Sequence, residues 1–288
     1  EMRERLTYLF FTLFHSLVTK VSHSARHDAK SNLVIATICA GLAVAAAPAS
    51  AGLVGYYDFE SSNANDSSGN GNHSTLGASV GFTAAGQGVN GGIAGDFVSV
   101  AGTANMISLP FDIRGTIMPN LTMSAFVRAG AGNGGFAKVL SHDNAGFDRT
   151  LGLDTRGGGP GYAAFTGSGV LNSGTAATAG GAYDFIAVRY DGTTVSLTVN
   201  GVHFTGTNNT DLNIGFTSLF VGGNPGFNED WIGQIDNVFV FDHILSDQEL
   251  DTIDQDGGIR TNEVPVPAAG LLMAGVIALF GAGALRRR

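Results

Sequence analysis

The sequence predicts an all-β domain, a sandwich or barrel of short antiparallel strands. Glycine is abundant at 43 of 288 residues, proline is scarce at 7, and charged residues make up 14%. This composition suits many short strands joined by turns and argues against a helical bundle. Apolar and polar side chains also alternate in several segments, which is the period of a half-buried strand.

The clearest of these segments is the hairpin pattern at 184–201, DFIAVRYDGTTVSLTVNG. Asp191-Gly192 is expected to supply the positive-φ positions of a tight turn between two strands. On the second strand Val195, Leu197 and Val199 face one side. Asn200-Gly201 then predicts a further turn into a third strand.

Other strands are expected at short intervals along the chain, with glycine turns between them. Their ranges are 52–60, 94–100, 105–109, 121–128, 136–142, 151–154, 162–165, 217–222 and 231–242. Strands at this spacing are typical of a sandwich or barrel. Ser246 and Glu249 form an S-x-x-E capping box, so a short helix is predicted to begin there.

The N-terminal region 1–51 has the pattern of a secretory signal peptide. Arg26 and Lys30 precede the apolar run 33–47. Ala49-Ser50-Ala51 is an A-x-A site, with cleavage expected after Ala51. The alternative is a membrane anchor or buried helix. The only cysteine, Cys39, lies in this segment, so the mature protein would have no disulfide and would rely on core burial, with or without a metal.

The C-terminal region 264–288 has three consecutive features. Val264-Pro265-Val266-Pro267 comes first, then eighteen uncharged residues at 268–285, then Arg286, Arg287 and Arg288. Eighteen residues of helix span a hydrocarbon core, and terminal arginines hold their end in the cytoplasm. Residues 256–263 would link this segment to a globular domain at 52–255.

This order resembles the PEP-CTERM sorting signal, in its VPLPA-type variant. The resemblance implies a transient stay in the inner membrane of a Gram-negative bacterium. An exosortase-type transpeptidase would recognise the proline box, and the domain would then reach the cell surface or be secreted. A plain single-pass tail anchor is the alternative.

The excess of acidic residues in the central region restricts the kinds of molecule that the protein is expected to bind. The stretch 52–285 contains seven basic and 21 acidic residues. Such a domain repels phosphate backbones, so nucleic acid is excluded as an expected partner. Calcium and neutral sugars are compatible with this charge.

The polar stretch 63–75 is a candidate calcium loop. Oxygen-bearing side chains recur at every second residue, in Asp66, Ser68, Asn70 and Asn72. Ca²⁺ prefers several oxygen ligands at this kind of spacing. The alternative is a solvated loop in which the same side chains bond their own backbone.

A second polar loop, SHDNAGFDR at 141–149, is a candidate sugar site. It offers Asp143, Asn144, Asp148 and Arg149 beside Phe147. Polar groups next to an aromatic ring are suited to sugar binding, although a plain surface loop has the same composition. Trp231 is expected to pack in the core rather than stack on a sugar.

Four segments together resemble the LamG-like, concanavalin A-like jelly-roll domains over 53–253. They are GLVGYYDFE…NDSSGNGNHST, LTMSAFVR, FIAVRYDGTTVSLTVNG and IGQIDNVFVFDHILSDQEL. The resemblance implies a two-sheet antiparallel sandwich whose first and last strands are neighbours. It would bring the Asp66 loop near Asp236, where several such domains hold a structural Ca²⁺. A cation would also relieve the cost of burying the Asp236 carboxylate.

The family also contains glycosidases, which need two carboxylates flanking the scissile bond. Their E-x-D-x-x-E pattern is missing, since the glutamates after Ala51 are Glu60, Glu229, Glu249 and Glu263. We therefore expect an exported, non-catalytic, calcium-stabilised module that binds extracellular polysaccharide or a surface protein. The alternatives are a structural surface protein without a ligand and a glycoside hydrolase.

Overall fold

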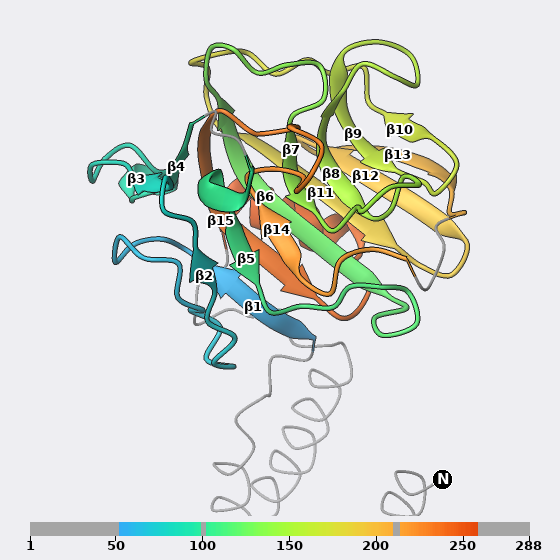
Figure 1. The fold of residues 1–288 in the computed structure, drawn as a ribbon, viewed down its shortest axis with the longest axis horizontal. Helices are drawn as coiled ribbons and strands as arrows, with labels where there is room; N and C mark the ends of the chain where they lie inside the picture. The colour runs from blue at the N-terminus through green and yellow to red at the C-terminus, as the bar shows by residue number, and fades with distance from the viewer. Residues whose placement is uncertain (1–51, 99–101, 210–213, 259–288) are drawn as a thin grey trace, which may run out of the picture. The chain divides into compact units, whose positions relative to one another are not determined.

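The computed structural model describes residues 52–98, 102–209 and 214–258 (Figure 1). The predicted signal peptide with Ala49 and Ala51, most of the linker, and the sorting motif with its membrane helix lie outside these residues. Within the described ranges, no helix is both long enough and apolar enough to cross a membrane.

Short strands dominate the described chain, as the sequence predicts. They are β1 (Leu53–Tyr57), β2 (Thr75–Leu76), β3 (Gly81–Phe82), β4 (Gly95–Phe97), β5 (Ile107–Leu109), β6 (Leu121–Ala129), β7 (Lys138–Ser141), β8 (Thr150–Asp154), β9 (Gly161–Phe165), β10 (Val170–Asn172), β11 (Asp184–Tyr190), β12 (Thr194–Val199), β13 (Val202–Thr207), β14 (Leu219–Val221) and β15 (Gly233–Phe241). Short 3₁₀ turns, η1 (Val89–Gly91) and η2 (Gly102–Asn105), and one α-helix, α3 (Asp247–Asp256), complete the elements.

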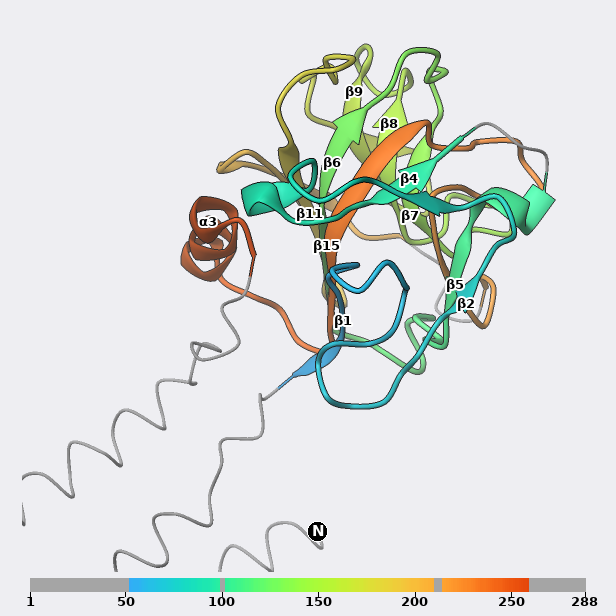
Figure 2. The ribbon, with the colours of Figure 1, turned by 90° about the vertical axis from the view of Figure 1, so that its left-hand side faces the viewer.

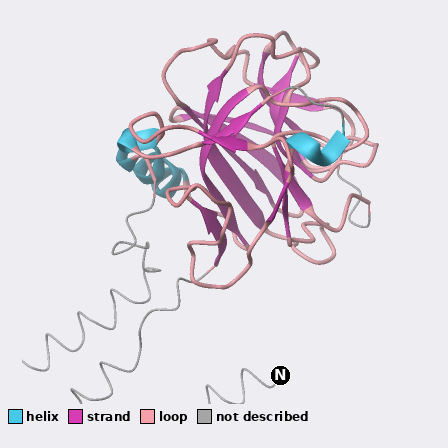
Figure 3. Cartoon of the chain, turned by 60° about the vertical axis from the view of Figure 1, so that its left-hand side comes forward, coloured by secondary structure: helices cyan, strands magenta, loops and turns pink. Residues whose placement is uncertain are grey.

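The strands form two antiparallel sheets that pack face to face (Figure 3). The first has the order β13-β12-β11-β6-β15-β4-β3, and β1 pairs with β15 beside that path. The second has the order β10-β9-β8-β7-β14-β5-β2. This confirms the two-sheet sandwich and the prediction that the first and last strands are neighbours.

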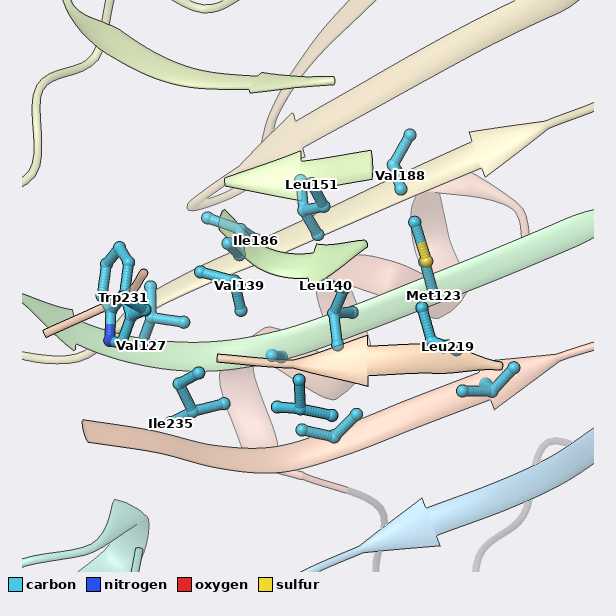
Figure 4. Close-up of a cluster of buried hydrophobic side chains, with 14 of the residues drawn as sticks. Met123, Val127, Val139, Leu140, Leu151, Ile186, Val188, Leu219, Trp231 and Ile235 are labelled. Carbon is cyan, nitrogen blue, oxygen red and sulfur yellow. The ribbon is translucent and has the colours of Figure 1, made fainter. Parts of the chain in front are cut away.

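The main core lies between the two sheets (Figure 4). Val195, Leu197 and Val199 point into it, as the alternation along the hairpin predicts. Figure 4 shows side chains of β6, β11 and β15 facing those of β7, β8 and β14. Trp231, which is completely buried, packs in this core and not on the surface, as expected.

A second apolar cluster covers the outer face of the first sheet. Phe126, Phe185 and Phe239 leave the sheet on this side and meet Leu250 and Ile253 of α3. Figure 2 shows α3 outside the sheet, away from the second sheet. The middle strands of the first sheet are therefore buried on both faces, which a half-buried pattern does not predict.

The start and end of α3 follow local rules. The Ser246 side chain accepts the Glu249 backbone N–H, and the Glu249 carboxylate accepts the Ser246 backbone N–H, so the predicted capping box is present. Gly257 ends the helix in the left-handed conformation, with φ of 66°.

One turn prediction is wrong. Asp191 and Gly192 have no positive φ, and the Asp191 carboxylate instead accepts the backbone N–H groups of Thr193 and Thr194. An aspartate that closes a turn with its own side chain removes the need for a left-handed backbone. The tight turn with two positive φ angles is Asn200-Gly201, at 48° and 73°.

Candidate functional site

The Asp66 carboxylate organises its loop by accepting backbone N–H groups. Its Oδ1 accepts from Tyr56 at 3.1 Å and Ser68 at 2.9 Å, and its Oδ2 accepts from Asn72 at 2.9 Å. Burial by itself would raise the pKa of Asp66, but these hydrogen bonds outweigh it and hold the pKa below its ordinary value. The side chain is therefore a charged acceptor already supplied with donors.

The asparagines of the same loop fasten it to β1. The carboxamide N–H of Asn70 donates to the Leu53 carbonyl at 2.8 Å, and that of Asn72 donates to the Val54 carbonyl at 2.7 Å. Both side chains thus present N–H groups to the protein, which is the arrangement of a self-bonded polar loop. In the described ranges, no group of three or more His, Cys, Asp or Glu side chains is arranged to hold a metal ion.

Asp236 has other partners. It lies at a bulge of β15, is completely buried, and accepts backbone N–H groups from Val89 at 2.8 Å and Asn237 at 2.7 Å. Burial raises its pKa to about 7, against those hydrogen bonds and with help from the nearby Glu60 and Asp58 carboxylates. Asp236, Glu60 and Asp58 therefore lie near one another, and we call them the acidic cluster. The predicted approach of Asp66 to Asp236 stays a prediction.

Glycines let a loop lie directly on the acidic cluster. A Cβ on Gly88 would lie 2.8 Å from Asp236 Oδ2, and one on Gly92 would lie 1.9 Å from Glu60 Oε1. The backbone N–H of Ile93 is 3.3 Å from both Glu60 oxygens. Sequence reasoning missed Glu60 in this role, although the glycine-rich stretch 86–92 is a signal of close backbone approach.

The predicted sugar loop 141–149 is mostly buried. Asp143, Asp148 and Arg149 are 4%, 2% and 2% exposed, and only Asn144 of the four predicted residues is exposed. Arg149 donates to the carbonyls of Ile113 at 2.7 Å and Met118 at 2.6 Å. Its guanidinium therefore holds the loop before β6, and a contact of Arg149 with a ligand stays a prediction.

Asp143 instead connects the loop to a residue on another segment. The Asn224 carboxamide is completely buried and donates to Asp143 Oδ2 at 3.0 Å and to Glu229 Oε2 at 2.8 Å. Burial raises the pKa of Glu229, while Asn224, Lys138 and Arg156 act against the rise. Glu229 lies in the loop that precedes β15.

Arg156 joins these groups at the surface. Its guanidinium makes two hydrogen bonds to Asp154, at 2.9 and 2.7 Å, and lies 3.8 Å from Glu229. Three aromatic rings surround it, with centroids 4.8 Å away for Phe136, 5.0 Å for Phe147 and 5.4 Å for Phe165. The Arg156 side chain is nevertheless 42% exposed.

We call Arg156, Phe136, Phe147 and Glu229 the Arg156 surface. It combines guanidinium donors, a carboxylate acceptor and the faces or edges of apolar rings. Below it, Lys138 is buried and donates to Asp154 at 2.9 Å, so this cation is already paired. Sequence reasoning missed Arg156 because nothing in the turn DTRGGG indicates that three phenylalanines from separate segments meet there.

The comparisons with known proteins agree with this fold. Residues 101–251 match the Laminin_G_3 family model, described as the concanavalin A-like lectin/glucanases superfamily, and this is just over half of the 288 residues. The chain belongs to this superfamily. A comparison with curated proteins found no match.

Solved structures share the fold at low identity. Domain 4 of AbnA, a GH43 extracellular arabinanase from Geobacillus stearothermophilus solved with arabinotriose, has a TM-score of 0.55 at 19% identity, covering 71% of this chain and 99% of that one. The binding domain of Paraclostridial Mosquitocidal Protein 1 has a TM-score of 0.54 at 14% identity, and that of botulinum neurotoxin serotype D has 0.52 at 10%. Each of these two covers 71% of this chain, which spans 52% of theirs.

The buried His142 of the sugar loop predicts a loss of stability in acid. Burial, with Arg149 nearby, lowers the pKa of His142 from 6.5 to about 4, and the Phe216 backbone acts against this shift. The folded state therefore holds it neutral. The stability gained is complete above pH 6.5 and disappears as pH falls toward 4, a change of about 3 kcal/mol.

Urea unfolding across this range measures the effect. His142→Leu is expected to lose less stability in acid than the wild type, because no proton must be excluded. His73→Gln, at an exposed histidine, should keep the full acid loss. Identical pH profiles for the wild type and His142→Leu would contradict this account.

Proposed function

We propose that this domain is a non-catalytic carbohydrate-binding module that takes neutral polysaccharide on the Arg156 surface. The observation that carries the proposal is the half-exposed guanidinium of Arg156. It is fixed by Asp154 and set among the rings of Phe136, Phe147 and Phe165. Fixed donors and acceptors beside apolar rings suit a sugar, which has hydroxyls on its rim and C–H groups on its faces.

The local charges favour a neutral ligand. The cations Lys138 and Arg156 are both paired with Asp154, and Glu229 and Asp143 add further negative charge. An anionic polysaccharide would therefore find no unpaired cation in this group of residues. Two structural neighbours were solved with sugars, arabinotriose for the arabinanase domain and SialylT for a botulinum neurotoxin binding domain, which adds support for carbohydrate as the ligand class.

The buried state of the nearest carboxylate pair favours binding over hydrolysis. Asp143 and Glu229 both accept from Asn224, but Asp143 is only 4% exposed and also accepts the Asp148 backbone N–H at 3.0 Å. A glycosidase needs two carboxylates that reach opposite sides of a sugar bond. The second candidate is a module of the same fold that binds a surface protein, since the exposed ring of Phe136 suits either partner.

Carbohydrate binding predicts a specific defect in Arg156→Ala. Retention on a panel of neutral polysaccharides such as arabinan, xylan and dextran should weaken roughly tenfold, which is about 1.4 kcal/mol. Arg114→Ala is the matched control, because Arg114 also pairs with a neighbouring aspartate, Asp112, away from the Arg156 surface. Equal retention of both variants, or release of sugar by the wild type, would contradict the proposal.

We also propose that Ca²⁺ stabilises the domain at Asp236 and not at the Asp66 loop. Asp236 is a buried carboxylate with two further carboxylates acting on it, whereas the Asp66 loop is already hydrogen-bonded to β1. Asp236 would supply a carboxylate ligand, and backbone carbonyls and water would complete the oxygen ligands, because no three carboxylates of the described ranges are arranged around one ion.

Calcium at about a hundred times its Kd would then add about 2.7 kcal/mol of stability. Thermal unfolding in CaCl2, in MgCl2 and in chelator measures this. Asp236→Asn should lose the calcium effect, while Asp66→Asn should keep it even if its basal stability drops. Loss of the calcium effect in Asp66→Asn but not in Asp236→Asn would place the ion at the Asp66 loop. A wild type with the same thermal stability in CaCl2 and in chelator would contradict any structural role for calcium.

The localisation remains a proposal drawn from the sequence. The domain is exported, held in the inner membrane by 264–288, and passed by an exosortase-type transpeptidase to the surface or medium. Cell fractionation in a Gram-negative host that carries such an enzyme should find mature protein beginning at Gly52. Deleting 264–288 should leave it soluble in the periplasm. Unprocessed full-length protein in the cytoplasm would contradict this.

A further inference from the structure

Most strands that end a sheet in this domain are very short. β2 and β3 have two residues each, and β10 has three. β13, which ends the first sheet, has six. Short edge strands protect proteins from pairing with other chains, because they offer few unpaired N–H and C=O groups. Among the described residues, β13 is therefore the longest strand at the end of a sheet.

The outer edge of β1 shows how this chain covers a longer edge. The Tyr56 N–H donates to the Asp66 carboxylate, and the Tyr56 carbonyl accepts the Ser67 N–H at 2.7 Å. The Leu53 carbonyl accepts the carboxamide N–H of Asn70. The loop thus makes the hydrogen bonds that a neighbouring strand would otherwise make, so β1 is closed to other chains.

The outer edge of β13 has no neighbouring strand. The Asn208 N–H donates to the Thr193 carbonyl at 2.8 Å, which continues the ladder between β12 and β13. The backbone groups of even-numbered residues in β13 therefore point to β12, and those of His203, Thr205 and Thr207 point the other way. In the part of the chain that the structure describes, no strand pairs with that side of β13.

This edge is exposed and uncharged. Thr205 and Thr207 are exposed, and Val202 is 56% exposed. The strand VHFTGT contains no Asp, Glu, Lys or Arg, whereas the stretch 52–285 has 21 acidic and seven basic residues. Two copies of such an acidic chain repel each other, so they can approach closely only where acidic residues are missing. The charged residues and prolines that guard many edge strands are missing as well.

The acids of α3 lie near one residue of the strand. The His203 ring is 3.6 Å from the Asp247 carboxylate and 3.5 Å from that of Asp251. Its Nδ1 is also 2.9 Å from the Thr198 hydroxyl of β12, so the ring lies with α3 over the outer face of the sheet. The backbone edge of β13 is perpendicular to that face and is left open.

The sequence of β13 is complementary to itself in one antiparallel register. With Thr205 opposite Thr205 of a second copy, His203 lies opposite Thr207 of that copy. Each of these outward-pointing pairs can exchange two hydrogen bonds. The same register places Phe204 opposite Gly206 of the second copy. Phe204 packs against the edge of the main core, and an aromatic ring beside a glycine on a neighbouring strand covers the space that the glycine leaves.

We propose that two copies of this chain associate through their β13 strands, so that their first sheets join into one continuous antiparallel sheet. A second copy is favoured over an unrelated extended peptide because this register opposes Phe204 to Gly206 twice and opposes no like charges. A six-residue strand makes a small interface, so we expect a dissociation constant on the order of 10 μM. The association does not use the Arg156 surface, which the second sheet supports.

Sedimentation equilibrium of the wild-type protein from about 1 μM to about 1 mM measures this association. The average mass should rise from that of one chain to that of two and stop there, because each copy has one β13 and a two-fold axis closes the assembly. A mass of one chain throughout the series would overturn the proposal, and so would growth beyond two chains.

Thr205→Lys tests the register, because it places two lysines directly opposite each other across the two-fold axis. Thr205 is exposed, so the fold should be kept while the dissociation constant rises roughly tenfold or more. Thr75→Lys is the matched control, with the same change of charge at an exposed threonine of the edge strand β2. It should associate like the wild type, as should Arg156→Ala. Equal dissociation constants for the two lysine variants would contradict the proposal.

Amide hydrogen exchange followed by NMR locates the interface without any substitution. The N–H groups of His203, Thr205 and Thr207 should exchange slowly at concentrations where the dimer forms, and quickly where it does not. Those of Phe204 and Gly206, which already point to β12, should exchange slowly at both. A dimer in which the Thr205 N–H stays in fast exchange would have its interface elsewhere and would overturn the proposal.

Discussion

The pairing of β15 with β1, β4 and β6 is the interaction on which the rest of the structure depends. β15 contributes Ile235, Val238 and Val240 to the main core and Phe239 and Phe241 to the cluster beneath α3. A strand that is buried on both faces and paired on both edges has few alternative positions. It fixes Asp236 against the loop at 86–93 and directs the chain into α3.

The second sheet supports the Arg156 surface through buried polar side chains on its outward side. Its outward side chains include Lys138, Asp154 and Phe165, which are buried because the loops at 142–149 and 224–230 fold over them. Buried polar groups are tolerated only when each has a partner, and Lys138 and Asp154 supply one another. The same hydrogen-bond network holds the Arg156 side chain in one orientation at the surface. The candidate site is therefore rigid because the buried Lys138 and Asp154 beneath it are fixed.

Much of the fold follows from local sequence patterns, and the candidate site does not. Alternation predicted the faces of 195–199, and the S-x-x-E spacing predicted the cap of α3, because both depend on neighbours in the chain. The hydrogen bonds of Arg149 and Asp66 could not be predicted because they are made to distant segments, to the carbonyls before β6 for Arg149 and to the Tyr56 backbone N–H of β1 for Asp66. Arg156 illustrates the same limit, since its three rings come from β9 and from two loops.

The contact between β1 and β15 also has a kinetic consequence. Leu53 pairs with Phe241, so the sheet cannot close until nearly the whole domain is available. Contacts of such long sequence separation form slowly, because much loop entropy is lost before they are made. A chain that emerges N-terminus first therefore cannot complete its first sheet until β15 is available, and until then it can still be threaded through a narrow channel. During that interval its incomplete sheets need protection from aggregation.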